Sequence, residues 1–194
     1  MKKVITMVGT SIFENYFEKN EARVNLLYIY REFKNKPLKN EGGNESNSFK
    51  NLINSVKNWA KETLRRNFEE SIHLSAEAKS IVKIKETVGE DIEVYLLSSY
   101  TYSSKIAGEM LAEFLPQIIG DDVAINRKEI VDLVVDDRNR FLKGISNLIE
   151  EIYRIAAGNW DNIIINITGG FKATIPFLTI LAQLNSCPIF YIFE

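Results

Sequence analysis

The chain has 194 residues, of which 45% are hydrophobic and 26% charged, proportions typical of one globular domain. Its 24 Lys and Arg against 26 Asp and Glu give a net charge of −2, which argues against the basic excess of proteins that bind long nucleic acids. One Cys and one His exclude a disulfide framework and argue against a structural zinc site. Because the sequence has neither an apolar run of roughly 20 residues nor a signal peptide, we expect a cytoplasmic protein. We also expect it to use no cofactor and no metal.

The first half of the chain predicts one strand followed by helices. The β-branched run 4–8 ends at Gly9, Thr10 and Ser11, a pattern typical of a buried strand and a tight turn. Residues 34–47, with Pro37 and two glycines, are expected to form a loop. Helices are expected over 21–33, 47–67 and 75–89, where apolar residues recur at helical spacing or a capping residue opens the segment.

Strands and helices alternate in the second half of the chain. Apolar segments predict strands at 92–97, 122–125, 130–135, 162–167 and 188–193. Helices are expected from 102 to 114 with Pro116 helping to end the helix, from 137 to 157, and from 171 to 185. Alternation of this kind predicts an α/β fold with a mainly parallel, doubly wound sheet flanked by helices.

Ligands of open parallel sheets bind outside the carboxyl ends of the strands, and three predicted strand exits carry small hydroxyl residues. Two of these exits also carry glycine. The candidate ligand-binding residues at or beside them are Gly9, Thr10, Ser11, Ser98, Ser99, Tyr100, Thr101, Arg138, Asn166, Thr168, Gly169, Gly170, Phe171, Lys172 and Thr174.

The turn from Thr168 to Lys172 is the richest of the three exits. Its two glycines let the backbone approach a ligand closely, and the start of the following helix offers free N–H groups. Lys172 would be unfavourable in a first helical turn unless an anion also lies there. The segment equally fits a plain tight turn, and it matches neither the Walker loop nor G-x-G-x-x-G. The residues alone therefore leave phosphate binding and a purely structural turn as alternatives.

Two motifs resemble those of CARF domains, the CRISPR-associated Rossmann-fold sensors of type III CRISPR systems. The motifs are Val8-Gly9-Thr10-Ser11 and Asn166-Ile167-Thr168-Gly169-Gly170-Phe171-Lys172-Ala173-Thr174. The resemblance is closest to the branch of stand-alone ring nucleases and sensor halves of HEPN ribonucleases. It implies a Rossmann-like fold and a homodimer that binds a cyclic oligoadenylate across its two-fold axis. Cyclic tetra-adenylate matches that symmetry, with cyclic hexa-adenylate as the alternative, and Tyr100 or Phe171 would stack on a base.

Some similar proteins also cleave the ring. In them a serine and a lysine at the positions of Ser11 and Lys172 support metal-independent attack of a ribose 2′-hydroxyl on its own phosphate, which leaves a 2′,3′-cyclic phosphate. The same residues occur in sensors that do not cleave, so both activities stay open. The alternatives are an α/β enzyme or regulator that binds another mononucleotide or dinucleotide cofactor, which the missing dinucleotide fingerprint disfavours, and a structural dimerisation module.

The domain expected from the resemblance covers residues 1–194. Residues 34–74 are long for a minimal sensor, and we expect them to be an insertion that covers the ligand. Because the chain stops just after an apolar strand, we also expect that the natural protein continues, with an effector domain at its C-terminal side.

Overall fold

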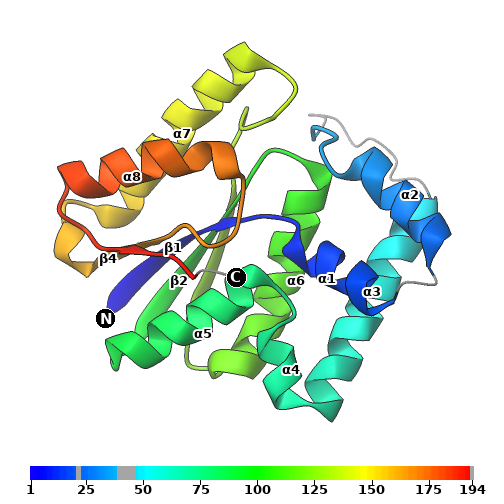
Figure 1. The fold of residues 1–194 in the computed structure, drawn as a ribbon. Helices are drawn as coiled ribbons and strands as arrows, with labels where there is room; N and C mark the ends of the chain where they lie inside the picture. The colour runs from blue at the N-terminus through cyan, green and yellow to red at the C-terminus, as the bar shows by residue number, and fades with distance from the viewer. Residues whose placement is uncertain (21–22, 39–46, 193–194) are drawn as a thin grey trace.

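The structure, a computed structural model, describes residues 1–20, 23–38 and 47–192. In these residues a parallel sheet of five strands has the order β3-β2-β1-β4-β5 (Figure 1). Its strands are β1 (Lys2–Val8), β2 (Ile92–Ser98), β3 (Ile125–Glu129), β4 (Ile163–Asn166) and β5 (Ile189–Phe190). All pairs in the sheet are parallel, and the Rossmann-like α/β prediction is confirmed.

Helices cover both faces of the sheet (Figure 1). The described helices are α1 (Ser11–Lys19), α2 (Val24–Phe33), α3 (Asn47–Arg66), α4 (Phe68–Ile72), α5 (Ala76–Val88), α6 (Tyr102–Ile119), α7 (Arg138–Ala156) and α8 (Ile175–Leu184). No helix in the described ranges is long and apolar enough to cross a membrane.

Alternation along the strands builds one hydrophobic core on each face of the sheet. In β1, Val4 and Val8 pack in the core formed with α1, α3, α5 and α6. Ile5 and Met7, which point to the opposite face, pack in the core with α7 and α8. A strand buried on both sides reads as a continuous apolar run, and this is the pattern that predicted β1.

Local capping signals fix several helix ends where the sequence predicted them. The Ser75 hydroxyl accepts a hydrogen bond from the Ala78 N–H at 3.0 Å and starts α5. Gly89 ends this helix with a φ of +65°. Asp137 accepts bonds from two N–H groups in the first turn of α7. These caps place the loops before α5 and α7 at fixed positions.

The predicted strands 122–125 and 130–135 are wrong, because β3 lies between them and takes only Ile125 from the first. β3 is an edge strand with mostly exposed polar side chains, so its hydrophobic signal is weak. The apolar run after it forms a turn against α7 instead. A Cβ on Gly144 would lie only 2.4 Å from the Leu133 backbone, so this glycine lets α7 approach the turn.

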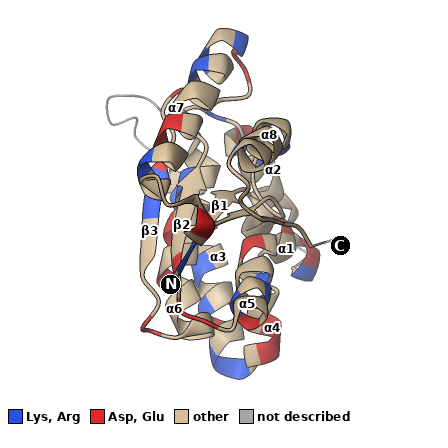
Figure 2. Cartoon of the chain, turned by 90° about the vertical axis from the view of Figure 1, so that its left-hand side faces the viewer, with Lys and Arg blue, Asp and Glu red and all other residues tan. Residues whose placement is uncertain are grey.

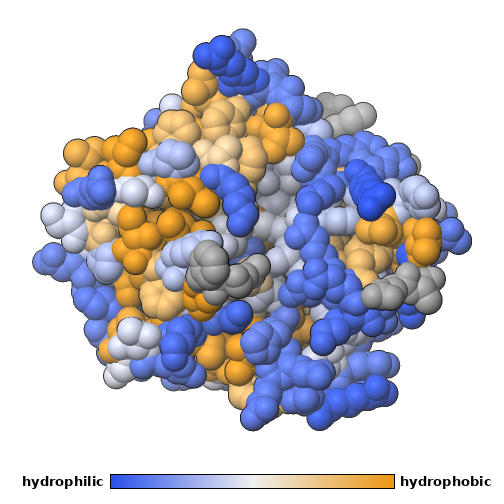
Figure 3. Space-filling view, in the orientation of Figure 1, coloured by the Kyte–Doolittle hydropathy of each residue, from blue (hydrophilic) through white to orange (hydrophobic). Residues whose placement is uncertain are grey.

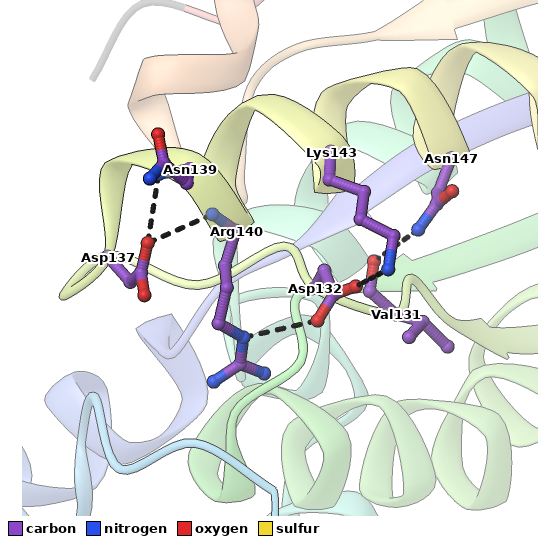
Figure 4. A network of polar contacts seen from close by, with 7 residues as sticks. All are labelled: Val131, Asp132, Asp137, Asn139, Arg140, Lys143 and Asn147. Atoms are coloured by element: carbon purple, nitrogen blue, oxygen red, sulfur yellow. Dashed lines mark hydrogen bonds and ion pairs between the residues drawn. The ribbon is translucent and has the colours of Figure 1, made fainter.

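Ion pairs hold the same turn to α7 (Figure 4). Asp132 has a φ of +63°, and its carboxylate pairs with Lys143 at 2.8 Å and Arg140 at 3.1 Å. Hydrogen bonds from Lys143 and Arg140 hold the pKa of Asp132 below its usual value. Asn147 donates to the Val131 carbonyl at 2.8 Å. The network therefore fixes the loop that joins the carboxyl end of β3 to α7.

One helix was not predicted, one predicted helix is present with a later start, and one predicted helix end is wrong. Helix α1, which starts at Ser11 directly after the first turn, was not predicted, while the expected helix 21–33 begins at Val24 and its first two residues lie outside the described ranges. Pro116 does not end α6, which continues to Ile119. Burial of Ile118 and Ile119 in the core stabilises this last turn despite the proline.

Candidate functional site

The chain order of the strands reverses between β1 and β4, and open parallel sheets bind ligands at such a switch point. The exits of β1, β2 and β4 meet there around a cavity of about 450 Å³. Its size lies within the roughly 300–1,000 Å³ of small-molecule sites. The predicted site residues that line it are Gly9, Thr10, Ser11, Ser99, Thr101, Thr168, Gly169, Gly170, Phe171 and Lys172.

Five other predicted residues lie outside the cavity wall: Ser98, Tyr100, Arg138, Asn166 and Thr174. Ser98 is buried and donates to the Ser104 carbonyl of α6 at 3.1 Å. The Tyr100 N–H donates to the Leu133 carbonyl at 2.8 Å. Arg138 is exposed at the start of α7. The structure thus brings together the strand exits at Gly9–Ser11 and Thr168–Lys172, and only part of the exit at Ser98–Thr101.

Asn166 and Thr174 shape the Gly-Gly turn from beneath. The fully buried Asn166 amide donates to the Ser80 hydroxyl of α5 at 2.7 Å and accepts from the Thr168 N–H at 3.1 Å. Thr174 donates to the Phe171 carbonyl at 2.7 Å. Both side chains are satisfied within the protein, so they position the turn rather than face the cavity.

The glycines at the cavity are required by close contacts between the two turns. A Cβ on Gly9 would lie 2.9 Å from the Gly170 nitrogen. Gly170 has a φ of +88°, and a Cβ there would lie 2.3 Å from the Met7 Cβ. A Cβ on Gly169 would lie 2.2 Å from Oε1 of Glu77. The first and third strand exits are therefore in van der Waals contact, with Glu77 of α5 beside them.

Glu77 is a buried carboxylate in the cavity wall, with only 1% of its surface exposed. The Gly9 N–H donates to its Oε1 at 2.8 Å, and the Ser11 hydroxyl donates to its Oε2 at 2.6 Å. The Ala76 N–H in turn donates to the Ser11 oxygen at 3.1 Å. Glu77 lies in the first turn of α5, where the helix dipole favours a negative charge. One carboxylate thus fixes the whole turn after β1.

The Gly-Gly turn beside Glu77, together with Lys172 after it, offers groups that attract an anion. Helix α8 starts at Ile175 rather than near Phe171 as expected, because residues Lys172–Thr174 form a 3-10 turn. Within the part of the chain that the structure describes, the N–H groups of residues 169–171 make no hydrogen bond, and the exposed Lys172 forms no ion pair. Unpaired N–H groups beside a lysine are groups that can attract an anion.

The cavity wall is balanced in charge, because Lys34 and Lys172 face two carboxylates, Glu14 and Glu77. Blue and red segments alternate along the helices in Figure 2, in accordance with the net charge of −2. The free N–H groups and Lys172 therefore supply the attraction for an anion without a basic surface around them.

A second lysine reaches the cavity from the segment after α2. Lys34 pairs with Glu14 of α1 at 2.5 Å, and Glu14 also accepts from the Tyr30 and Thr10 hydroxyls at 3.1 and 3.2 Å. Partial burial by itself raises the pKa of Glu14, but the hydrogen bond and charge of Lys34 outweigh it and hold the pKa below its usual value. Burial raises the pKa of Tyr30. Lys34 and Glu14 together form one wall of the cavity.

Phe171, the aromatic residue of the Gly-Gly turn, lines the cavity and packs against α7. The ring of Phe171 packs edge-on to Phe141, with 5.6 Å between the centroids, and Phe141 also contacts Phe177 of α8. No group of three His, Cys, Asp or Glu in the described ranges is placed to hold a metal ion.

A family of CRISPR-associated proteins, Cas_APE2256, has a sequence model that matches residues 72–194, more than half of this chain. The chain belongs to this CRISPR-associated family. The CRISPR context predicted from the two motifs is therefore confirmed. The matched segment contains Glu77 and the Gly169–Gly170 turn, whereas the exit of β1 with Ser11 precedes it.

Three charged residues that line the cavity of this CRISPR-associated protein were missed from the sequence: Glu77, Glu14 and Lys34. Glu77 follows the capping residue Ser75 by two positions, which is an ordinary place for an acid at a helix start. Nothing in the sequence distinguishes it from the exposed Glu86 on the same helix. Glu14 belongs to the helix that was not predicted, so its pairing with Lys34 had no signal in the sequence.

Proposed function

We propose that this CRISPR-associated protein is a homodimeric receptor for cyclic tetra-adenylate and that it cleaves the ring without a metal. One observation carries the proposal: three strand exits, distant in sequence, converge on one cavity at the switch point of the sheet. The cavity combines small hydroxyl residues, free N–H groups and Lys172. These are groups that bind phosphate and ribose without base-specific contacts.

The phosphates of the ring would lie against the Gly-Gly turn. The N–H groups of residues 169–171, which have no hydrogen-bond partner among the described residues, would donate to an anion, and Lys172 would add a full charge beside them. A phosphate there also explains a lysine at the start of a helical segment, where acids are otherwise preferred. Phe171, held edge-on by Phe141, offers an aromatic surface for an adenine.

A dimer would let two protomers each bind half of a symmetric ring. Apolar side chains gather over α7 and α8 in Figure 3. Leu142 of α7 is 49% exposed, and Ile180 and Leu184 of α8 are 57% and 77% exposed. Because Lys172 lies just before α8, a partner that covers α8 along its whole length would reach the cavity. An exposed apolar patch next to a ligand site is typical of a protein interface.

For cleavage, the ring would supply its own nucleophile, a ribose 2′-hydroxyl. The 2′-oxygen attacks the neighbouring phosphorus and loses its proton to water, while the bond from phosphorus to the 5′-oxygen breaks and this oxygen takes a proton from water. The products carry 2′,3′-cyclic phosphate ends. Lys172 and the free N–H groups would stabilise the charge on the phosphoryl oxygens, while Ser11 would orient the 2′-hydroxyl. Neither residue is a strong general base at neutral pH, so we expect slow turnover.

The direct test mixes purified protein with radiolabelled cyclic tetra-adenylate in the presence of EDTA. We expect linear di-adenylates with cyclic phosphate ends, and slower cleavage in Ser11→Ala and Lys172→Ala. Lys50→Ala, which removes an exposed lysine of α3 outside the cavity wall, should cleave at the wild-type rate. Equal rates in the wild type and both site variants would remove Ser11 and Lys172 from the mechanism.

The cofactor-binding alternative makes a different prediction. Thermal melting with NAD, ATP and cyclic tetra-adenylate compares the ligand classes in one assay. We expect only the ring to raise the melting temperature. A shift with NAD or ATP and none with the ring would contradict the proposal.

A further inference from the structure

The buried carboxylate of Glu77 has contacts that determine the orientation of the Ser11 hydroxyl. A carboxylate can only accept hydrogen bonds, so the Ser11 O–H must point at Glu77. The separation of 2.6 Å lies in the range of O–H bonds to a charged acceptor, which are shorter and stronger than neutral ones. The proton of Ser11 is therefore committed to Glu77 and turned away from the cavity.

The acceptor sites of the Ser11 oxygen can be assigned in the same way. A hydroxyl has one donor and two acceptor sites. The Ala76 N–H, at 3.1 Å, occupies one acceptor site. Ser11 lines the cavity, so the remaining lone pair is the group that a ligand meets. Towards a ligand, Ser11 is then an acceptor of one hydrogen bond and not a donor.

We propose that Glu77 is a positioning residue that makes the site selective for rings with a ribose 2′-hydroxyl. Glu77 presents Ser11 as an acceptor, and a 2′-hydroxyl is the donor on a nucleotide ring that fits it. A phosphate oxygen, which can only accept, is disfavoured at this point and is directed toward Lys172. The inference rests on the proposed binding of a cyclic oligoadenylate and adds how that site distinguishes a ribose from a sugar without the donor.

Replacement of Glu77 by glutamine reverses this polarity with almost no change in shape. The amide oxygen can still accept from the Gly9 N–H, while the amide nitrogen would donate to the Ser11 oxygen. The Ser11 proton would then point into the cavity, and Ser11 would no longer accept from a 2′-hydroxyl. Glu86→Gln on the same helix is the matched control, because Glu86 is exposed and pairs only with Lys83 among the described residues.

The test measures the affinity for cyclic tetra-adenylate and for its 2′-fluoro analogue, before product accumulates. Fluorine keeps the size of the hydroxyl but cannot donate a hydrogen bond. We expect the wild type and Glu86→Gln to bind the natural ring about tenfold more tightly than the analogue. A tenfold difference corresponds to about 1.4 kcal/mol, the size of one lost hydrogen bond. In Glu77→Gln the two affinities should become nearly equal.

Two results would overturn the inference while leaving ring binding intact. One is equal affinity of the wild type for both rings, a comparison that needs no variant and so does not depend on folding of Glu77→Gln. The other is an undiminished preference for the natural ring in Glu77→Gln. Failure of the wild type to bind either ring would instead refute the proposed function itself.

Discussion

Gly169→Ala is a steric probe of the contact between the Gly-Gly turn and Glu77. The new Cβ would lie 2.2 Å from Oε1 and 2.5 Å from Cδ of Glu77. Ordinary contact requires about 3.5 Å, so the carboxylate must move by about 1 Å. Such a movement breaks its bonds with Gly9 and Ser11. Gly169 is not among the glycines with positive φ, so the substitution adds no left-handed backbone strain.

The magnitude follows from this overlap. Overpacking costs about 1–3 kcal/mol, and each 1 kcal/mol lowers the melting temperature of a chain this long by about 2–4 °C. We expect Gly169→Ala to melt about 2–12 °C lower and to bind cyclic tetra-adenylate at least about tenfold more weakly, because its Ser11 is no longer held. Differential scanning calorimetry and titration calorimetry measure the two effects.

Gly89→Ala is the control that distinguishes a loss of stability from a loss of ligand binding. Gly89 ends α5 with a φ of +65°, and a Cβ added there would have no neighbouring atom within 4 Å. Alanine at this position therefore meets only backbone strain of about 1–2 kcal/mol. This variant should melt lower with unchanged affinity for the ring. If Gly169→Ala keeps both its melting temperature and its affinity, the close contact with Glu77 does not exist as described.

Three further predictions address the charge of Lys172, the Glu14–Lys34 pair in the cavity wall and the proposed dimer interface. Lys172→Ala should weaken ring binding and make its salt dependence shallower, which calorimetry at several salt concentrations measures; an unchanged slope would exclude a phosphate contact. The pKa of Glu14 is lowered in the folded state, so its pairing with Lys34 stabilises the fold fully above its ordinary pKa of 4.5, and this stability is lost as the pH falls through the lower folded value. Urea unfolding between neutral and acid pH should therefore show a smaller loss for Glu14→Gln than for the wild type, and identical profiles would refute the pairing. Leu184→Lys should convert a dimer to a monomer in light scattering, and a dimer that persists would move the interface away from α8.

The sheet could be predicted because its central strands are buried on both faces. β1, β2 and β4 read as apolar runs followed by small residues, and these runs set the order of the elements. β3 could not be found in this way, since an edge strand exposes most of its side chains. The more apolar residues 130–135 gave a stronger strand signal, but they form a turn that packs against α7. Gly144 allows this close contact because it has no side chain.

The candidate site was predictable as a set of loops but not as a set of contacts. Glycines and hydroxyl residues at strand exits identified most of the lining. Glu77 was not predicted because its role depends on the position of α5 beside the exit of β1. Its partners Gly9 and Ser11 precede it in the sequence by 68 and 66 positions. Asn166 illustrates the reverse case: its motif pointed to a ligand, and its amide is used to hold the turn.

Titration calorimetry of the wild-type protein with cyclic tetra-adenylate tests the central claim most directly. The account predicts binding at micromolar concentration or below, with one ring for every two chains. Absence of heat at micromolar protein, or a ratio of one ring for each chain, would contradict a receptor whose two halves share a single ring.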